Sequence, residues 1–383
     1  MGTEPEIGQR HRSTYQREEV LVSDPRRQTD VVAAADRAGG ALDLFTRASA
    51  RLRRYIPFDA AVWTATDPET GLVTAPMLVE NLGSGEGCGA YWESEFLEEN
   101  VLPFRDLTRA AVPAAALRAA TGGVPVRSAR FRRLLGAQGV EDELRAVLRA
   151  GDRPWGLISL FRMRGGADFA PDEVALLAGL SEPLAGRLRR FARPTESDGG
   201  STSSAPGLLL LDRHGEANSI NDEARRYLAR LPDGPSVPSA LGLDLPIWVA
   251  GAALQARAIA LGRDRGGARV RIRTVDGLWL TCHASCLTGL DGKPGPVALV
   301  IEPAAAADLT GMVADAYGLT SRELEVARLV ARGLPTAEIA AALFLSPHTV
   351  RDHLKALFGK TAVSSRVGLV ARLFAEQHRS STT

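Results

Sequence analysis

The spacing of hydrophobic residues divides the chain into three blocks. Between Val31 and Ala192, and again between Gly207 and Pro303, stretches with helical spacing are interleaved with short runs typical of strands. After about Gly318 only the helical spacing remains. The pattern therefore predicts a multidomain fold, in which two α/β domains (31–192 and 207–303) precede an all-α domain (318–383).

Shorter segments separate these blocks. Residues 1–30 are polar and carry RHR and PRR clusters, which predicts a disordered or weakly ordered tail. Residues 193–206 (RPTESDGGSTSSAP) have the composition of a flexible linker. Within residues 304–317, we expect a helix from about Asp308 to Tyr317 that connects the second α/β domain to the last block.

In the first block, two hairpins lie between two helices. Turn signals mark both hairpins, DPETG at 67–71 and GDRP at 151–154. The region between the hairpins has no regular pattern. In chain order, the expected elements are a helix over 41–53, strands over 59–66, 72–78, 143–150 and 155–162, and a closing helix that opens at 169–173.

In the second block, two short strands precede the helices and three longer strands follow them. Alternation is clear in the later strands, where Val270 and Ile272 share one face. The expected elements are strands over 208–212 and 217–221, helices from Asp222 and over 246–261, and strands over 269–274, 279–287 and 297–302.

The last block centres on residues 346–360 (SPHTVRDHLKALFGK), which predict a capped amphipathic helix. The Ser346 hydroxyl can accept from an amide of the first turn, and Pro347 follows where a missing N–H costs nothing. The apolar face comprises Val350, Leu354, Leu357 and Phe358, and the opposite face carries His348, Asp352 and Lys355, with Arg351 beside them.

Three further helices are expected around this one. A capping box at Thr320–Glu323 opens the first, which ends at Gly333. The second runs from about Thr336 to Leu343, and the last from Arg366 to about Gln377. Two helices, a short turn and a capped third helix with a polar outer face describe a helix-turn-helix.

The run from Leu319 to Leu373 closely resembles the LuxR-type (GerE or NarL type) DNA-binding domain, at the family's spacing and without a gap. Two departures are Pro335, where a small polar residue is usual, and Thr361-Ala362, which replace the usual Leu-Gly. The matching residues are Leu319, Thr320, Arg322, Glu323, Glu325, Val326, Gly333, Leu334, Glu338, Ile339, Ala340, Leu343, Ser346, Thr349, Val350, His353, Leu354, Lys360, Val363, Ser365, Arg366, Leu369 and Val370.

The resemblance implies that the helix from Ser346 reads DNA in the major groove as part of a dimer. The family's base-reading positions fall on Arg351, Asp352 and Lys355, and the helical wheel independently places them on or beside the outward face, as it does His348. Phosphate contacts are expected from Thr336, Ser346, Thr349, Lys360 and Arg366, and dimer contacts from Val367, Val370, Ala371 and Phe374. His353 is expected to be a packing residue.

The charge distribution agrees with a nucleic-acid partner for the last block. From Gly318 to Thr383 there are nine Lys and Arg residues and five Asp and Glu residues, a net charge of +4. The whole chain carries only +1. Positive charge is therefore concentrated where phosphate would be bound.

The two α/β domains resemble sensory modules. Residues 31–192 resemble a GAF domain, most specifically in WGLISLFR and DFAPDEVALLAGLSEPLAGRL, and residues 207–303 resemble a PAS domain, mostly in LLLLDRHGEANSINDEARRYL. A GAF fold can enclose a small ligand, a cyclic nucleotide, a haem or nothing. Candidate pocket residues are Trp63, Cys88, Tyr91, Trp92, Phe96 and Phe104, for which a plain core role is the alternative.

Cysteine chemistry offers little. Cys88 lies in a glycine-rich run (GSGEGCG) and is a candidate for an exposed, redox-sensitive thiol, but no Lys-Ser/Thr follows, so the run is not a phosphate loop. On a strand, Cys282 and Cys286 share a face but lie about 13 Å apart, and His283 points the other way. We therefore expect no metal site, no cofactor and, from three cysteines, no disulfide framework.

Other protein classes lack support in the sequence. No run of 18 apolar residues and no signal-peptide pattern occur, which predicts a cytoplasmic protein with no membrane partner. The strand–helix alternation of a receiver domain is absent, an acyl-homoserine-lactone receptor would have about one sensory domain, and no converging catalytic set supports an enzyme.

The sequence therefore predicts a cytoplasmic, dimeric bacterial transcription regulator. Its expected partners are double-stranded promoter or operator DNA and a second copy of the chain, with a small-molecule effector and RNA polymerase as candidates. The alternative is a constitutive DNA-binding scaffold, whose GAF-like and PAS-like domains bind no ligand and serve dimerisation or a protein partner.

Overall fold

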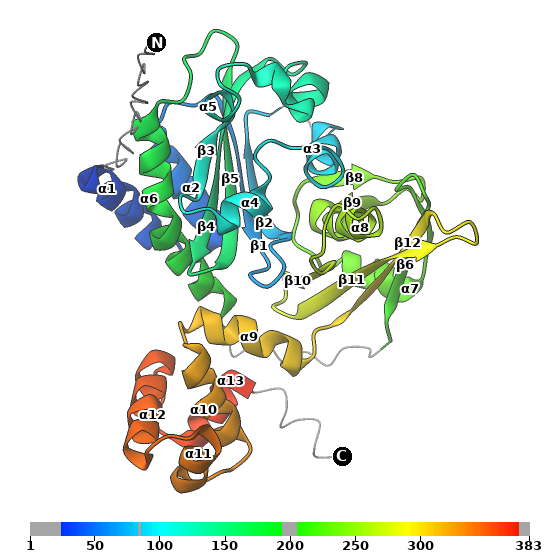
Figure 1. Ribbon diagram of the computed structural model, residues 1–383. Coiled ribbons are helices and arrows are strands. Elements are labelled where there is room, and N and C mark those ends of the chain that lie inside the picture. Colours follow the sequence, from blue (N-terminus) through cyan, green and yellow to red (C-terminus); the bar gives the residue numbers. More distant parts are fainter. Residues whose placement is uncertain (1–23, 83–85, 194–204, 375–383) are drawn as a thin grey trace, which may run out of the picture.

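The computed structural model describes residues 24–82, 86–193 and 205–374. In it, two five-stranded antiparallel sheets lie side by side, and helices at the C-terminal end pack beneath the first of them (Figure 1). We call residues 24–193 the first α/β unit and residues 205–303 the second α/β unit. Residues 318–374 are the C-terminal helices.

The first sheet has the strand order β2-β1-β5-β4-β3. Its central strands are buried along nearly their whole length, because helices cover both faces of the sheet. The strands are β1 (Ala60–Thr66), β2 (Val73–Glu80), β3 (Ala114–Ala116), β4 (Val140–Ala150) and β5 (Arg153–Met163).

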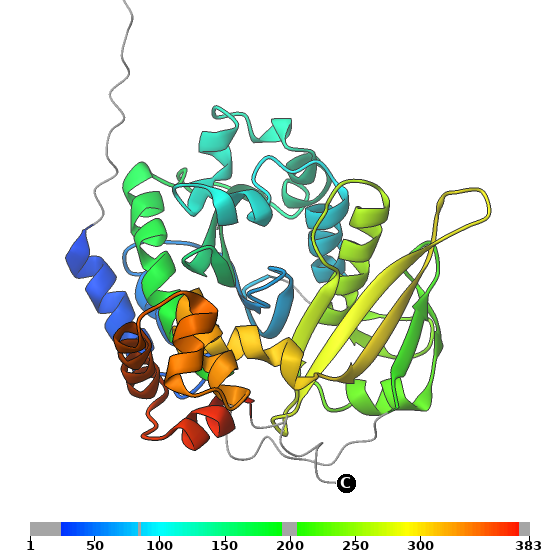
Figure 2. The same ribbon diagram turned by 60° about the horizontal axis from the view of Figure 1, so that its bottom comes forward.

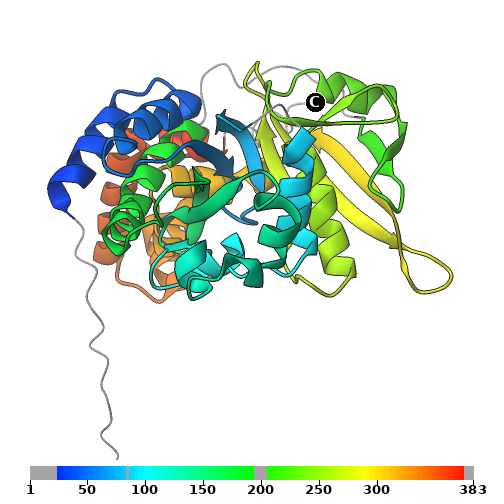
Figure 3. The ribbon, with the colours of Figure 1, turned by 90° about the horizontal axis from the view of Figure 1, so that it is seen from above.

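The helices of the first unit form two layers. On one face lie α1 (Pro25–Asp36), α2 (Ala41–Leu52) and α6 (Pro171–Leu188), which share an apolar core with Trp63 and Ile158 of the sheet. On the other face lie α3 (Glu86–Leu97) and α4 (Phe104–Arg109), and α3 stands between this sheet and the second unit (Figure 3). Shorter elements are α5 (Leu117–Ala120), η1 (Pro125–Arg127), η2 (Phe131–Leu135) and η3 (Arg189–Ala192).

Most elements expected in this unit are confirmed, with two corrections. The weakly ordered tail was predicted to reach residue 30, but Asp24 caps α1 and Pro25 opens it. The region expected to lack regular structure contains α3 and α4. A single apolar stripe is missing from α3 because both of its sides are covered, one by the sheet and one by α8, and its two glycines lower its helix propensity.

The second sheet has the order β10-β11-β12-β6-β7. When the short β8-β9 hairpin is left out and the strands are numbered from one within each unit, both sheets have the strand order 2-1-5-4-3. The expected strands and helices are confirmed as β6 (Gly207–Leu211), β7 (Ala217–Ile220), α7 (Asp222–Leu228), α8 (Ile247–Ala260), β10 (Arg269–Arg273), β11 (Trp279–Thr288) and β12 (Pro294–Pro303), with β8 (Ser236–Pro238) and β9 (Asp244–Pro246) between the helices.

The two units share a buried interface. Helix α8 packs on its own sheet and also on β2 and α3 of the first unit. At the edge of this interface, the guanidinium of Arg271 on β10 donates from Nη2 and Nε to the carboxylate of Asp67, at 2.5 and 2.8 Å. Both side chains are at most 2% exposed. An ion pair so deeply buried requires its partner, because removal of water from either charge alone is costly.

The predicted connecting helix is confirmed as α9 (Ala306–Ala316). It packs on η3 of the first unit and on α13 of the C-terminal helices (Figure 2). The C-terminal helices are α10 (Ser321–Ala331), α11 (Thr336–Leu343), α12 (Pro347–Thr361) and α13 (Arg366–Phe374). Their apolar core continues through Met312 and Val313 of α9 into the core of the first unit.

Candidate nucleic-acid interface

Helix α12 begins as its sequence predicts. The Ser346 side chain accepts a hydrogen bond from the backbone N–H of Thr349 at 3.1 Å, and Pro347 occupies the first turn. On the inner side, Val350, Leu354 and Leu357 are buried. This apolar stripe docks α12 on α10 and α11 and fixes which side of the helix faces solvent.

The outward side of α12 carries the candidate base readers. Arg351, Asp352 and Lys355 are exposed, as is His348. His348 Nδ1 lies 3.0 Å from Asp352 Oδ2, one helical turn away. Within the described residues, Arg351 and Lys355 have no ion-pair partner. The surface we call the reading face, His348, Arg351, Asp352 and Lys355, therefore combines two cations available for new contacts with an acceptor held by a neighbouring imidazole.

An ion pair between Lys360 of α12 and Glu323 of α10 holds the two helices together. Lys360 Nζ lies 2.6 and 2.9 Å from the two carboxylate oxygens of Glu323 on α10 and donates to the Gly318 carbonyl at 3.0 Å. Burial raises the pKa of Glu323, but the Lys360 hydrogen bond and the Thr320 backbone N–H outweigh it and hold the pKa below its usual value. Glu323 also completes the predicted capping box with Thr320.

The candidate phosphate contacts divide into two kinds. Ser346 is exposed and Thr349 half-buried, both at the N-terminus of α12, and Thr336 opens α11. Lys360 and Arg366 are cations whose charged groups have partners within the fold, and Thr336 is one of the partners of Arg366. Arg366 donates to the Leu334 carbonyl at 2.8 Å and to Thr336 Oγ1 at 2.7 Å, so it ties α13 to the start of α11. Phosphate binding by these two side chains would compete with bonds that hold the helices together.

The candidate dimer residues on α13 are likewise not all on one surface. Val367 is 81% exposed and Ala371 is exposed, whereas Val370 is half-buried. Phe374 is 4% exposed and belongs to the core shared with α9. In this arrangement Phe374 is unavailable to a second copy, and the exposed surface of α13 is centred on Val367 and Ala371.

The structure separates the six candidate pocket residues into three places. Cys88, Tyr91 and Trp92 line a cavity of about 890 Å³ in the first unit. Phe96 and Phe104 line a different cavity of about 980 Å³ between the two units, which Trp92 also reaches. Trp63 packs with Phe45 in the core on the opposite face of the sheet. Its strand alternates, so the neighbouring Val62, not Trp63, reaches the cavity.

Sequence reasoning missed several residues of the 890 Å³ cavity. Met77 and Phe161 lie on strands that the sequence predicts, and Leu135 lies on η2. No sequence pattern near any of the three residues indicates that their side chains line one cavity. The sequence did offer one signal about the lining. Side chains of neighbouring strand residues point to opposite faces of the sheet, so Val62 and Trp63 cannot both face the cavity.

Cys88 does not fit an exposed reactive thiol. It lies on α3, is half-buried, and burial raises the pKa of its thiol to about 11. Because the thiolate is the reactive species, the protonated thiol is a weak nucleophile near neutral pH. The position of Cys88 on α3 and its partial burial therefore do not favour the role of an exposed, redox-sensitive thiol in a loop.

Neither a metal-binding cluster nor a membrane-spanning helix occurs among the residues that the structure describes. No group of three or more His, Cys, Asp or Glu side chains there is arranged to hold a metal ion. No helix of this part of the chain has the length and apolar character needed to cross a membrane.

Comparison with known proteins points to one part of the chain. Residues 318–373 match the family described as bacterial regulatory proteins, luxR family. A nitrate/nitrite response regulator protein homolog of Haemophilus influenzae is 48% identical over 61 residues, which are 16% of this chain and 29% of that protein. The transcriptional regulatory protein UhpA of Escherichia coli is 48% identical over 56 residues, 15% and 29% of the two chains. The chain thus spans under a third of these relatives' length.

Similarity in structure extends further but is weak. The crystal structure of Escherichia coli SdiA is 13% identical, with 91% of this chain and 97% of that chain covered at a TM-score of 0.33. The chromophore-binding domain of a bacteriophytochrome from R. palustris covers 43% of this chain at 13% identity and a TM-score of 0.30. The assignment of the C-terminal helices accordingly comes from sequence.

Proposed function

We propose that this chain, which carries a luxR-family domain at its C-terminus, is a dimeric, sequence-specific transcription regulator that reads the major groove with α12. The observation that carries the proposal is the reading face, where Arg351, Asp352 and Lys355 are exposed on a helix whose other side is docked. The major groove of B-DNA admits an α-helix, and base edges there present a distinct pattern for each base pair.

Each residue of the reading face has a role in this proposal. Arg351 and Lys355 donate to guanine O6 and N7, and Asp352 accepts from cytosine N4. His348, whose imidazole contacts the Asp352 carboxylate, orients that acceptor or reaches a neighbouring base itself. Each good side-chain–base pairing contributes about 1–3 kcal/mol of discrimination against the wrong base.

Phosphate contacts position the reading helix. We propose Thr336, Ser346 and Thr349 for this role, since hydroxyl groups and backbone amides at helix N-termini bind phosphate oxygens. Lys360 and Arg366 add positive charge nearby, but their internal bonds favour a first role in holding the C-terminal helices together.

Dimerisation is proposed through α13. Val367 and Ala371 form its exposed surface, with Val370 at the edge. An aliphatic side chain that is 81% exposed, as Val367 is, gains free energy when a second copy removes it from water. A symmetric dimer would then place two reading helices on two half-sites of one operator.

The two α/β units, proposed as GAF-like and PAS-like sensory domains, would control this reader through α9. Arg271 is central to the connection, because it binds Asp67 of the first unit and donates from Nη1 to the backbone carbonyl of Asp308 on α9 at 2.5 Å. Arg269 of the same strand donates to the Asp308 carboxylate at 3.0 Å. A shift between the units would therefore be transmitted to α9, which packs on α13.

The proposal places the protein in the bacterial cytoplasm, with promoter DNA and RNA polymerase as partners. It is tested by selection of bound sites from a random DNA pool with the purified full chain. A palindromic site with fixed half-site spacing is expected. No enrichment by the full chain, with or without cell extract as a source of effector, would contradict the proposal.

A further inference from the structure

A partly open cavity, lined mainly by the first unit, is not used by the DNA-reading role. The cavity measures about 890 Å³ and lies between α3 and the sheet. Its buried wall comprises Val62, Met77, Tyr91, Trp92, Leu135 and Phe161. Binding sites for small molecules in proteins span about 300–1,000 Å³, so the space is large enough for a ligand rather than for one or two waters.

The lining of this cavity carries no charged side chain among the described residues. Gln138 contributes an uncharged amide to the lining, and two other polar side chains have partners away from the cavity. The Tyr91 hydroxyl lies 2.8 Å from Ser159 Oγ and donates to Glu143 at 3.3 Å, and Asn81 Nδ2 donates to the Asp59 carbonyl at 2.8 Å. The surface that faces the cavity consists mainly of carbon and sulfur atoms.

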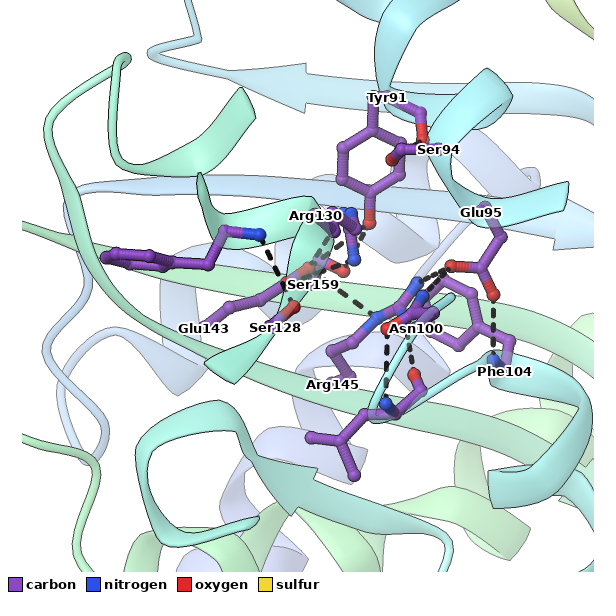
Figure 4. A network of polar contacts seen from close by, with 12 residues as sticks. Tyr91, Ser94, Glu95, Asn100, Phe104, Ser128, Arg130, Glu143, Arg145 and Ser159 are labelled. Atoms are coloured by element: carbon purple, nitrogen blue, oxygen red, sulfur yellow. Dashed lines mark hydrogen bonds and ion pairs between the residues drawn. The ribbon is translucent and has the colours of Figure 1, made fainter. Parts of the chain in front are cut away.

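Charged side chains next to the Tyr91 ring are paired with one another. Arg130 stacks on that ring with its Cζ 4.1 Å from the centroid and donates to both oxygens of Glu143, at 3.1 and 3.3 Å. Arg145 binds Glu95 at 2.7 Å in the same network (Figure 4). These side chains are buried and paired, so they offer no counter-charge to an ionic ligand.

We propose that this cavity binds an uncharged, largely apolar small molecule. An ion placed there would lose hydration without gaining a charged partner, whereas an apolar molecule gains free energy in proportion to the surface it buries. Apolar cavities of this kind hold apolar ligands in preference to water. The raised pKa of the Cys88 thiol, caused by burial, is consistent with a low-polarity lining.

The ligand would contact the junction of the two units. Pro235 of the second unit lines the cavity, together with α3 residues of the first. On its other side α3 packs against α8 and β8, and the packing is close at Gly89, where an added Cβ would lie 3.3 Å from Val237. A ligand that displaces α3 therefore also shifts the second unit. This consequence rests on the proposed function, but binding itself does not.

The test uses the full chain without DNA and an uncharged fluorescent probe, N-phenyl-1-naphthylamine. Saturable binding of one probe per chain is expected, with displacement by decan-1-ol at concentrations about tenfold or more below those needed with decanoate at pH 8, a difference of about 1.4 kcal/mol. Equal displacement by the alcohol and the carboxylate, or no saturable binding, would overturn the proposal.

Neighbouring residues on β2 supply a matched pair of variants. Met77→Trp fills the cavity and should reduce probe affinity at least about tenfold. Leu78→Trp places the same side chain toward the opposite face and should leave affinity within about twofold. Equal affinities for both variants, when circular dichroism shows both folded, would locate the probe elsewhere. Because DNA is absent, a failure here is distinct from a failure to select an operator.

Discussion

Arginine is used in opposite ways in the two parts of the molecule. In the α/β units, Arg130, Arg145 and Arg271 are each about 1% exposed, and each guanidinium binds at least one carboxylate. On α12, Arg351 is exposed, as is Lys355. A buried cation needs its partner to offset lost hydration, so it defines architecture. An exposed cation retains its hydration until another molecule replaces it.

The position of a charged side chain, more than its type, therefore indicates its role. Lys360 is the intermediate case, with its side chain 35% exposed and its ammonium bound to Glu323. By residue type it resembles Lys355, but by its contacts it resembles the buried arginines.

Loss of the Arg271 guanidinium should have the largest effect. Arg271→Ala leaves Asp67 buried without its partner, which should lower the free energy of unfolding by about 3–5 kcal/mol in urea titration. Arg265→Ala removes an exposed arginine of the same unit and should change it by at most about 0.5 kcal/mol. In the double variant Asp67→Ala/Arg271→Ala, the loss should be smaller than the sum of the single losses. Additive losses would mean that the pair is not coupled.

Loss of the Arg351 guanidinium should leave the fold intact and change the DNA preference. Arg351→Ala is expected to lower affinity for the selected site by about 1–3 kcal/mol and to relax the preference at one base pair per half-site. Repeated selection from the random pool with the variant measures both. An unaltered consensus sequence would show that Arg351 does not read a base.

Neutralisation of Glu323 should have a smaller effect that depends on pH. The pKa of Glu323 is lowered in the folded protein, so its ion pair stabilises the fold above the unfolded pKa near 4.5, and this contribution disappears as pH falls through the lower, folded pKa. Glu323→Gln should therefore reduce the melting temperature at pH 7 and have little effect near pH 3. Equal reductions at both pH values would indicate lost packing instead of lost charge.

The smallest effect is expected for chemical modification of the Cys88 thiol. Burial raises the pKa of this thiol to about 11, so the thiol is protonated near neutral pH. Iodoacetamide at pH 7.5 should modify Cys88 slowly in the folded chain and faster in urea. Peptide mass spectrometry, with half-buried Cys286 as an internal reference, reports both rates. Rapid modification of Cys88 in the folded chain would contradict its burial, which is also an argument for the low-polarity lining of the cavity.

Local signals account for what the sequence predicted well. The start of α12 depends on Ser346, Pro347 and an apolar stripe within one helix, and the capping box of α10 lies within four residues. The strands of both sheets except β3 likewise followed from turn signals and alternation beside them, whereas β3 lies in the region where no regular pattern was expected. These elements could be identified because the residues that determine them are neighbours in sequence.

Contacts distant in sequence account for what was missed. Asp67 and Arg271 are 204 positions apart, and no pattern near either residue indicates the pair. Helix α3 escaped detection because α8, from the other unit, covers the side that would otherwise be polar. Lys360 was predicted to contact DNA phosphate and Phe374 to contact a second copy, whereas the structure gives each an internal contact.

The central claim, that exposed cations of α12 read bases, is tested most directly with two charge-matched variants of the full chain. Fluorescence anisotropy at one fixed salt concentration would compare Lys355→Ala on α12 with Arg328→Ala on α10, each on the selected site and on a scrambled site. The account predicts that Lys355→Ala loses about 1–3 kcal/mol on the selected site alone, whereas Arg328→Ala shows no difference between the two sites. Equal losses on both sites for Lys355→Ala would contradict it.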